Sequence, residues 1–191
     1  MKIEKPKNDE FYSESDADSV GEQFDPFDDS ITTVCFTGHR NIPEQLKSVI
    51  NELLAQVLAG LYARGARIFK AGGAVGFDTI AAQAVIDLKA RTLDRDIKLV
   101  LCLAAPDQDK RFSRCDQIVY NLIRENSDSV IYEAEQSNSE SYFARNRRLV
   151  EGSDVCVAYC TEQKGGTYYT CTKALTSGVE FINIADFIEL E

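Results

Sequence analysis

The stretch Ile97–Leu103 reads IKLVLCL, an apolar run with the length of one β-strand. Successive side chains of a strand point to opposite faces of its sheet, so a run of this kind must be covered on both faces. Such strands are typical of parallel sheets that carry helices on each side. The stretch therefore predicts an α/β protein with a central parallel sheet.

Strand-like and helix-like segments alternate on both sides of this stretch. On its N-terminal side we expect a strand at Ile31–Phe36, a helix opened by Pro43 with apolar residues at steps of three and four, a strand at Arg67–Ala71 and an Ala-rich helix through about Lys89. On its C-terminal side we expect helices at about Asp109–Glu125, Ser141–Glu151 and Tyr168–Ser177, and strands at Ser129–Tyr132, Asp154–Tyr159 and Val179–Ile184. This order predicts a Rossmann-like, doubly wound, mostly parallel sheet flanked by helices.

The acidity of the chain is concentrated at its N-terminus. The 191 residues carry a net charge of −10, and residues 1–30, with ten acidic residues and three lysines, account for −7 of it. This segment has too few apolar residues to offset the entropy of ordering, so we expect a disordered acidic tail over 1–30 and one domain over 31–191. The tail is either a solubilising extension or a partner-binding segment anchored by Phe24–Phe27.

The sequence has the features of a cytoplasmic protein. We find no apolar leader and no run of about 18 apolar residues, so neither export nor a membrane partner is expected. The six cysteines form no C-x-x-C pair, and with a single histidine they predict reduced, packed thiols and no metal site.

Three glycine-containing turns follow predicted strands, at Thr37–Arg40 (TGHR), Gly72–Asp78 (GGAVGFD) and Gly165–Thr167 (GGT). Glycine lets backbone N–H groups approach an anion, and a helix N-terminus behind the turn adds donors and a positive dipole end. Because ligands of open parallel sheets bind at the carboxyl ends of the strands, the three turns together favour a phosphate or ribose site. None matches the dinucleotide fingerprint or the P-loop, so no NAD or ATP cofactor is predicted.

Charged residues beside these turns are candidates for ligand contacts. Arg40 either forks onto a phosphate or is a surface arginine, and His39 is a general acid or base, a ligand contact or a structural residue. Asp78 either binds a ribose hydroxyl or caps the helix that follows it. Of the arginines in the segment 145–148, helical spacing allows one or two to enter a pocket.

The motifs TGHR, GGAVGFD, PDQDKRFSRCDQIVY, YFARNRRLVEGSDVCVAY and KGGT-Y-Y-T together resemble the YpsA-like branch of the SLOG superfamily, in order from about Thr33 to Ile184. That superfamily also holds the lonely-guy (LOG) phosphoribohydrolases and the DNA-processing protein DprA. The resemblance implies a Rossmann-like fold that binds nucleotides or their derivatives, commonly as a homodimer. The site residues predicted from the turns and the resemblance are Gly38, His39, Arg40, Gly72, Gly73, Gly76, Asp78, Arg145, Asn146, Gly165, Gly166 and Thr167.

The resemblance also identifies one departure from the LOG enzymes. Arg145 occupies the place of their catalytic arginine, and Gly166-Thr167 matches the Gly-Thr of their phosphate loop, but Thr170 stands in the place of their catalytic glutamate. A threonine hydroxyl supplies neither the charge nor the pKa that cleavage of an N-glycosidic bond requires. Arg145 is thus the best candidate for a catalytic residue, and hydrolysis would need another acid in the pocket, such as Asp78 or Glu162.

Three functions follow, in order of preference. The first is a binding module, namely a sensor, carrier or sequestering protein for a nucleotide-like small molecule. The second is a phosphoribohydrolase or other N-glycosidase acting on nucleoside phosphates. The third is single-stranded DNA binding, which is disfavoured because the domain is slightly acidic, has no tryptophan and has only a short basic-aromatic patch at Lys110–Arg114, read as a solvated helix start.

Overall fold

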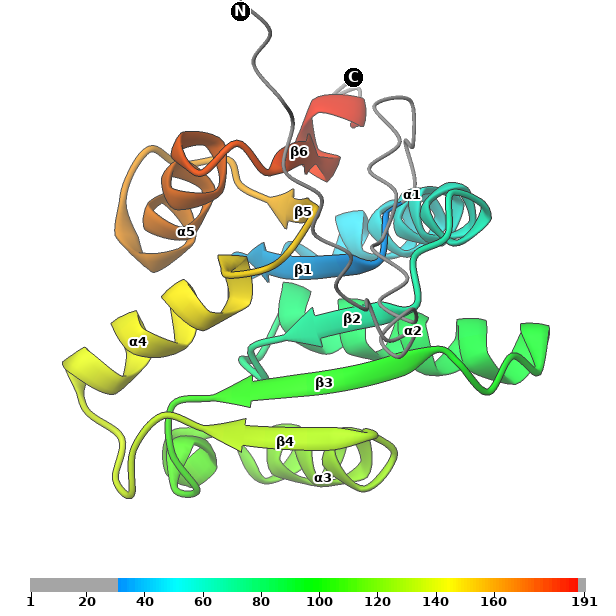
Figure 1. The fold of residues 1–191 in the computed structure, drawn as a ribbon. Helices are drawn as coiled ribbons and strands as arrows, with labels where there is room; N and C mark the ends of the chain where they lie inside the picture. The colour runs from blue at the N-terminus through cyan, green and yellow to red at the C-terminus, as the bar shows by residue number, and fades with distance from the viewer. Residues whose placement is uncertain (1–30, 189–191) are drawn as a thin grey trace, which may run out of the picture.

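The computed structural model describes residues 31–188, and within this range six strands form one sheet in which every pairing is parallel (Figure 1). The strands are β1 (Thr33–Gly38), β2 (Ile68–Ala71), β3 (Lys98–Leu103), β4 (Ser129–Tyr132), β5 (Val155–Tyr159) and β6 (Glu180–Asn183). The α-helices are α1 (Glu44–Ala63), α2 (Phe77–Thr92), α3 (Arg114–Glu125), α4 (Ser139–Val150) and α5 (Gly165–Thr176). The predicted Rossmann-like α/β fold is confirmed, while the acidic tail predicted over 1–30 lies outside the described residues.

The strand order reverses once, between β1 and β5. The sheet runs β4-β3-β2-β1-β5-β6, so the chain first moves toward one edge and then returns to continue on the other side of β1. Because parallel crossovers are right-handed, this reversal places α1, α2 and α3 on one face and α4 and α5 on the other (Figure 1). A sheet of this kind has its ligand crevice at the reversal point, beyond the carboxyl ends of β1 and β5.

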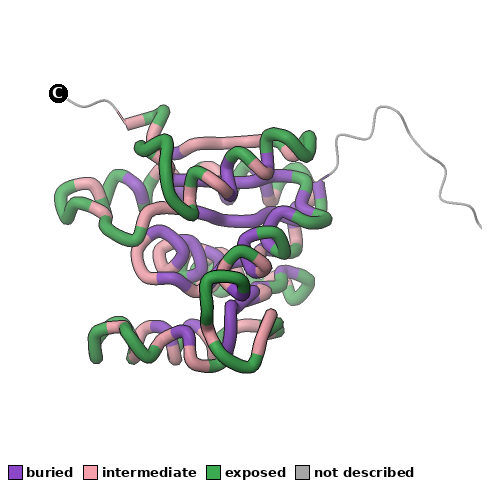
Figure 2. Tube along the Cα trace, turned by 90° about the vertical axis from the view of Figure 1, so that its left-hand side faces the viewer, coloured by how far each residue is buried: buried purple, intermediate pink, exposed green. Residues whose placement is uncertain are grey.

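The two faces of the sheet are packed differently. Val34 and Phe36 of β1 point into the larger core beneath α1–α3, which also buries Ile50, Leu54, Leu58 and Leu61 of α1. The opposite face is lined by Cys35, Cys102 and Cys156, which pack against Leu149 and Val150 of α4 and Ala174 of α5. Each large apolar side chain buried in this way contributes about 1.5–3 kcal/mol. Figure 2 shows the buried segments gathered in the strands and the inner sides of the helices.

All six cysteines are free thiols, and the predicted packing of the thiols holds for four of them but not for Cys115. Cys35, Cys102, Cys156 and Cys171 are buried, Cys160 is half-buried, and Cys115 is exposed on α3. Leu149 and Val150 of α4 pack against the buried thiols of this face, and the helix contacts β1 and β3.

Two helix boundaries differ from the prediction. The helix expected from Asp109 is broken, because a 3₁₀ turn at Gln108–Arg111 ends before Ser113, whose side chain accepts a hydrogen bond from the Asp116 N–H and begins α3. The last helix begins at Gly165 rather than near Tyr168. The Gly-Gly-Thr segment is therefore the first turn of α5 and not a connection that precedes it.

No helix within 31–188 is long and apolar enough to span a membrane.

Candidate functional site

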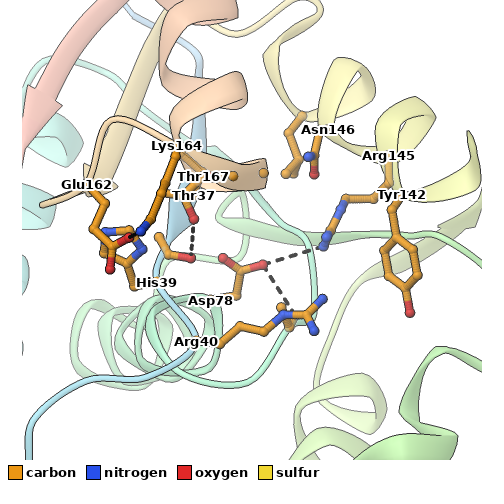
Figure 3. A pocket seen from close by; sticks show the side chains of 15 residues that line it. Thr37, His39, Arg40, Asp78, Tyr142, Arg145, Asn146, Glu162, Lys164 and Thr167 are labelled. Atoms are coloured by element: carbon orange, nitrogen blue, oxygen red, sulfur yellow. Dashed lines mark hydrogen bonds and ion pairs between the residues drawn. The ribbon is translucent and has the colours of Figure 1, made fainter. Parts of the chain in front are cut away.

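A polar cavity of about 300 Å³ lies at the reversal point of the sheet (Figure 3). Segments from all parts of the chain meet there: the end of β1, the β2–α2 loop, one face of α4, and the start of α5. The lining residues are Thr37, Gly38, His39, Arg40, Ala74, Asp78, Tyr142, Arg145, Asn146, Leu149, Glu162, Lys164, Gly165, Gly166 and Thr167. Nine of the twelve predicted site residues are thus brought together at one cavity.

The start of α5 forms one wall. Lys164 is its N-cap residue, and no side chain caps the free N–H groups of the first turn, which contains Gly165, Gly166 and Thr167. The helices α1 and α2 also lack a side-chain cap, whereas α3 and α4 are capped by Ser113 and Asn138. The Thr167 hydroxyl donates a hydrogen bond of 2.9 Å to the Gly38 carbonyl, which ties this turn to the end of β1. The N-terminus of α5 is therefore a firmly held set of donors open to the cavity.

Arg145 approaches the cavity from α4. The residue is buried, with only 6% of its surface exposed. Its Nη1 donates a hydrogen bond to the Gly72 carbonyl and lies 3.6 Å from Asp78 Oδ2. Its Nε is buried and has no hydrogen-bond partner among the described residues. Burial lowers the pKa of the guanidinium, while the Asp78 carboxylate raises it. One donor of a buried cation is thus left for a group that residues 31–188 do not supply.

Asp78 has a different role from helix capping. The N-cap of α2 is Gly76, and no side chain caps this helix, so the interpretation of Asp78 as a cap is wrong. Its carboxylate instead turns back to accept the Ala74 N–H at 3.3 Å and to face Arg145, which orders the β2–α2 loop. Burial raises the pKa of this carboxyl, and Arg145 partly offsets that effect.

His39 is tied into the backbone. Its Nε2 accepts the Thr161 N–H at 2.9 Å, and its carbonyl accepts the Phe77 N–H at 3.1 Å. The imidazole therefore links the end of β1 to the loop before α5, and an accepting Nε2 places the proton of the neutral ring on Nδ1. The side chain lines the cavity with one nitrogen already in use.

The three loop glycines Gly72, Gly73 and Gly76 lie behind the cavity wall, where Ala74 is the lining residue of their loop. Gly72 is needed for a close approach, because a Cβ at this position would clash with the Arg145 guanidinium. Gly76 has φ +84°, and a Cβ there would clash with the Arg40 carbonyl. These glycines allow the loop to pack tightly around the residues that line the site.

Thr170 is fully buried, and its hydroxyl donates at 2.9 Å to the Gly166 carbonyl of its own helix. It is not a lining residue. The position that holds the glutamate in LOG enzymes therefore supplies no acid or base to this cavity. Asp78 and Glu162 do line it, and Glu162 forms an exposed ion pair of 3.4 Å with Lys164.

Apart from Glu162, which was considered as a possible acid, five lining residues were not among the predicted site residues, namely Thr37, Ala74, Tyr142, Leu149 and Lys164. Tyr142 precedes Arg145 by one helical turn, so helical spacing places both on one face, and this signal was available. Of the other arginines on α4, Arg147 and Arg148 are exposed, and Arg148 pairs with Glu133. Within 31–188 no group of three or more His, Cys, Asp and Glu side chains is placed to hold a metal ion.

A doubly wound parallel sheet with a polar cavity at its reversal point defines a Rossmann-like α/β protein. More particularly, the chain belongs to the YspA SLOG family (YpsA), whose model matches residues 35–185. The comparison with curated proteins gave no match.

Solved structures with similar folds include two DNA processing proteins. The DNA processing protein A of Helicobacter pylori, described for its single-stranded DNA binding mode, has a TM-score of 0.56 at 18% identity, over 81% of this chain and 65% of that one. DprA of Streptococcus pneumoniae has a TM-score of 0.58 at 18% identity, over 79% of this chain and 49% of that one. The structural-genomics protein TM1055 has a TM-score of 0.51 at 15% identity, over 79% and 72%. The chain thus spans less than two thirds of the length of both DNA processing proteins, and at these identities the likeness concerns the fold.

Proposed function

We propose that the protein binds a nucleotide or a nucleotide-derived small molecule in the cavity between β1, α4 and α5, as a sensor, carrier or sequestering module. The observation that carries this proposal is the pairing of an uncapped helix N-terminus with a buried guanidinium that retains an unused donor. Both line the same cavity.

A phosphate group fits this combination. The N–H groups of the Gly165–Thr167 turn and the positive end of the α5 dipole favour an anion, and Lys164 adds a charge at the rim. Arg145 stands on the opposite side of the cavity (Figure 3). Because its Nε lacks a partner, an anion that accepts from it satisfies a donor whose burial is otherwise costly.

The size of the cavity supports a small nucleotide. Its 300 Å³ lie at the lower end of the roughly 300–1,000 Å³ typical of small-molecule sites. Backbone donors recognise a phosphate, which leaves the identity of the base to the side chains around the rim.

The experiment is mass spectrometry of the small molecules released when the freshly purified protein is denatured, followed by calorimetric titration with adenosine 5′-monophosphate. A released nucleotide, or saturable binding below high micromolar concentration, is the expected result. The proposal would be wrong if no nucleotide were released and if adenine, guanine and pyrimidine nucleotides all failed to bind.

A second candidate is an N-glycosidase acting on nucleoside phosphates. It is favoured by the two carboxylates, Asp78 and Glu162, that line the cavity although Thr170 has replaced the LOG glutamate. One of them would stabilise the oxocarbenium character of the ribose or activate water. Release of free base from a nucleoside monophosphate, abolished in Asp78→Asn or Glu162→Gln with binding retained, would establish it.

Single-stranded DNA is the third ligand class. The Helicobacter pylori DNA processing protein of similar fold is described as binding it. Such binding depends on phosphate neutralisation and weakens steeply with salt. Binding of an oligonucleotide that persists at about 150 mM salt, and that competes with a mononucleotide, would favour this class over a small-molecule ligand.

A further inference from the structure

A second cavity adjoins the first, and two side chains line both of them. It measures about 240 Å³ and is lined by Arg40, Val75, Gln108, Arg111, Phe112, Ser113, Asp116 and Tyr142. Arg40 and Tyr142 also line the first cavity. A third cavity of about 370 Å³ continues beyond it and again includes Arg111 and Tyr142. The three therefore form one row that leads from the start of α5 to the 3₁₀ turn at Gln108–Arg111.

Tyr142 is the side chain common to all three cavities. Its ring lies near two cations, with the Arg145 guanidinium 5.8 Å and the Arg40 guanidinium 6.0 Å from the ring centroid. The ring is half-buried, so part of it remains open to a ligand. A nucleoside that passes from one cavity to the next must run along this ring, on which its planar base can stack.

Two guanidiniums that line the second cavity, those of Arg40 and Arg111, form no close ion pair within residues 31–188. Among the residues described, neither Arg40 nor Arg111 takes part in an ion pair within 4.0 Å, whereas the neighbouring Lys110 is paired with Asp107. The cavity also contains the Asp116 carboxylate, which accepts the Ser113 hydroxyl at 2.6 Å. Two arginines against one carboxylate leave the cavity with a net positive charge.

These features distinguish the second cavity from a solvated helix start. Gln108 anchors the 3₁₀ turn, because its amide is buried, donates to the carbonyls of Gly72 and Gly73 and accepts the Ala104 N–H. The backbone that carries Arg111 is thus held against the loop behind the first cavity. An arginine on a rigid turn loses less conformational entropy when it binds an anion than one on a mobile loop does.

We propose that the cavity between Arg40 and Arg111 is a second anion subsite, and that the ligand class is a nucleotide with a second phosphoryl group held apart from the first. This inference rests on the proposed function and narrows it. The first phosphate binds at the start of α5, the nucleoside runs along Tyr142, and the second phosphate is taken by the two arginines. A nucleoside 3′,5′-bisphosphate and a linear dinucleotide both carry this arrangement, and the third cavity would hold the second nucleoside of the dinucleotide.

The test compares four probes by calorimetry on the full chain: adenosine 5′-monophosphate, ADP, adenosine 3′,5′-bisphosphate and the linear dinucleotide pApA. ADP is the matched control, because its second phosphate is attached directly to the first, whereas the second phosphate of the bisphosphate or pApA is separated from the first by a nucleoside. We expect the bisphosphate or pApA to bind about ten- to a hundredfold more tightly than the monophosphate, the range of one or two charge-assisted hydrogen bonds. Tighter binding of pApA than of the bisphosphate identifies the dinucleotide class, and the reverse identifies the bisphosphate.

The variant Arg111→Ala should remove this advantage and leave the affinity for the monophosphate unchanged. Arg114→Ala is the control. It removes the same charge only three residues further along the chain, and the Arg114 side chain lines none of these cavities. Equal affinities of the wild type for ADP, pApA and the bisphosphate would overturn the second subsite, and so would equal losses of affinity in the two variants. In either case, binding of the monophosphate would still support the first phosphate site. If no probe binds the wild type, both proposals fail.

Discussion

Arg145 and Asp78 form an ion pair at the cavity with 3.6 Å between Nη1 and Oδ2, and both side chains are more than nine-tenths buried. Taking two charges out of water is costly, and their mutual attraction offsets that cost only when both remain. The pair also fixes the loop behind the cavity, because Arg145 donates to the Gly72 carbonyl and Asp78 accepts the Ala74 N–H. Stability and the proposed ligand binding therefore involve the same guanidinium, and separate variants are needed to distinguish them.

Removal of the arginine should strongly destabilise the fold. Arg145→Ala leaves Asp78 buried without a counter-ion, and we expect a loss of about 3–5 kcal/mol in the free energy of unfolding, measured in urea. The double variant Arg145→Ala/Asp78→Ala should recover part of this loss, because it removes the unpaired charge as well. If the double variant were less stable by the sum of the two single effects, the two side chains would not be coupled.

Ligand binding is better tested with a charge-conserving change. Arg145→Lys retains a cation but lacks the Nε donor and the planar fork, so nucleotide affinity should fall about tenfold or more while the fold persists. Arg148→Lys on the exposed side of the same helix is the matched control and should bind as the wild type does. Equal affinities in the two variants, measured by calorimetry, would show that Arg145 does not contact the ligand.

Thr170 should be structural. Because its hydroxyl is fully buried and bonded within α5, Thr170→Val should change the free energy of unfolding by about 1 kcal/mol or less and leave nucleotide affinity unchanged. Thermal denaturation and calorimetry measure the two effects. A loss of turnover on nucleoside monophosphates in this variant, with binding intact, would instead place Thr170 in a catalytic role.

Two glycines should respond in opposite directions to an added methyl group. A Cβ at Gly38 would lie 2.5 Å from Phe77 Cγ, so Gly38→Ala should cost about 1–3 kcal/mol of stability. Gly60 lies in α1 with no atom within 4 Å of such a Cβ, and Gly60→Ala should stabilise the protein by about 0.4–1 kcal/mol. Urea denaturation of both variants tests whether β1 and α2 are in as close contact as the structure has them.

Asp154 should contribute to the loss of stability in acid. Partial burial opposes ionisation, but hydrogen bonds from the Thr33 and Thr32 N–H groups outweigh it and lower the pKa of the carboxyl. A lowered pKa in the folded state means that the contribution is present above the unfolded value of about 3.9 and is lost as the pH falls through the folded value. At pH 7, Asp154→Asn should be less stable by about 1 kcal/mol, and the difference from the wild type should shrink below about pH 4. A constant difference between pH 7 and pH 3 would contradict the assignment.

The order of elements could be predicted because it depends on local patterns. The apolar run at Ile97–Leu103 and the alternation around it correctly indicated a parallel sheet with two helical layers. The start of α3 has a local signal, because Ser113 is a typical N-cap residue and its side chain accepts the Asp116 N–H, but the 3₁₀ turn before it depends on Gln108 packing against the glycine loop. That contact joins residues 36 positions apart, and no local pattern encodes it.

The sequence indicated which segments contribute to the candidate site, but not how their side chains are arranged around the cavity. The glycine turns mark the carboxyl ends of the strands, and Arg145 was selected by its resemblance to the LOG arginine. Whether a loop glycine lines the cavity or packs behind it depends on tertiary contacts, such as the close approach of the Arg145 guanidinium to Gly72, and no local pattern contains these. The second cavity was missed because Arg111 and Tyr142 belong to segments that meet only in three dimensions.

The reversal of strand order means that the cavity spans the boundary between two halves of the sheet. The Thr167 hydroxyl donates to the Gly38 carbonyl and the His39 side chain accepts the Thr161 N–H, and both hydrogen bonds cross this boundary near the site. The elements β6 and α5 form a short flank at the edge of the sheet, and they share the smaller core with α4 and with β1, β3 and β5. A ligand held at once by α5 and Arg145 would fasten this flank to the rest of the molecule. Amide hydrogen exchange in α5 and β6 should then slow in proportion to ligand occupancy, so that the flank opens only when the site is empty.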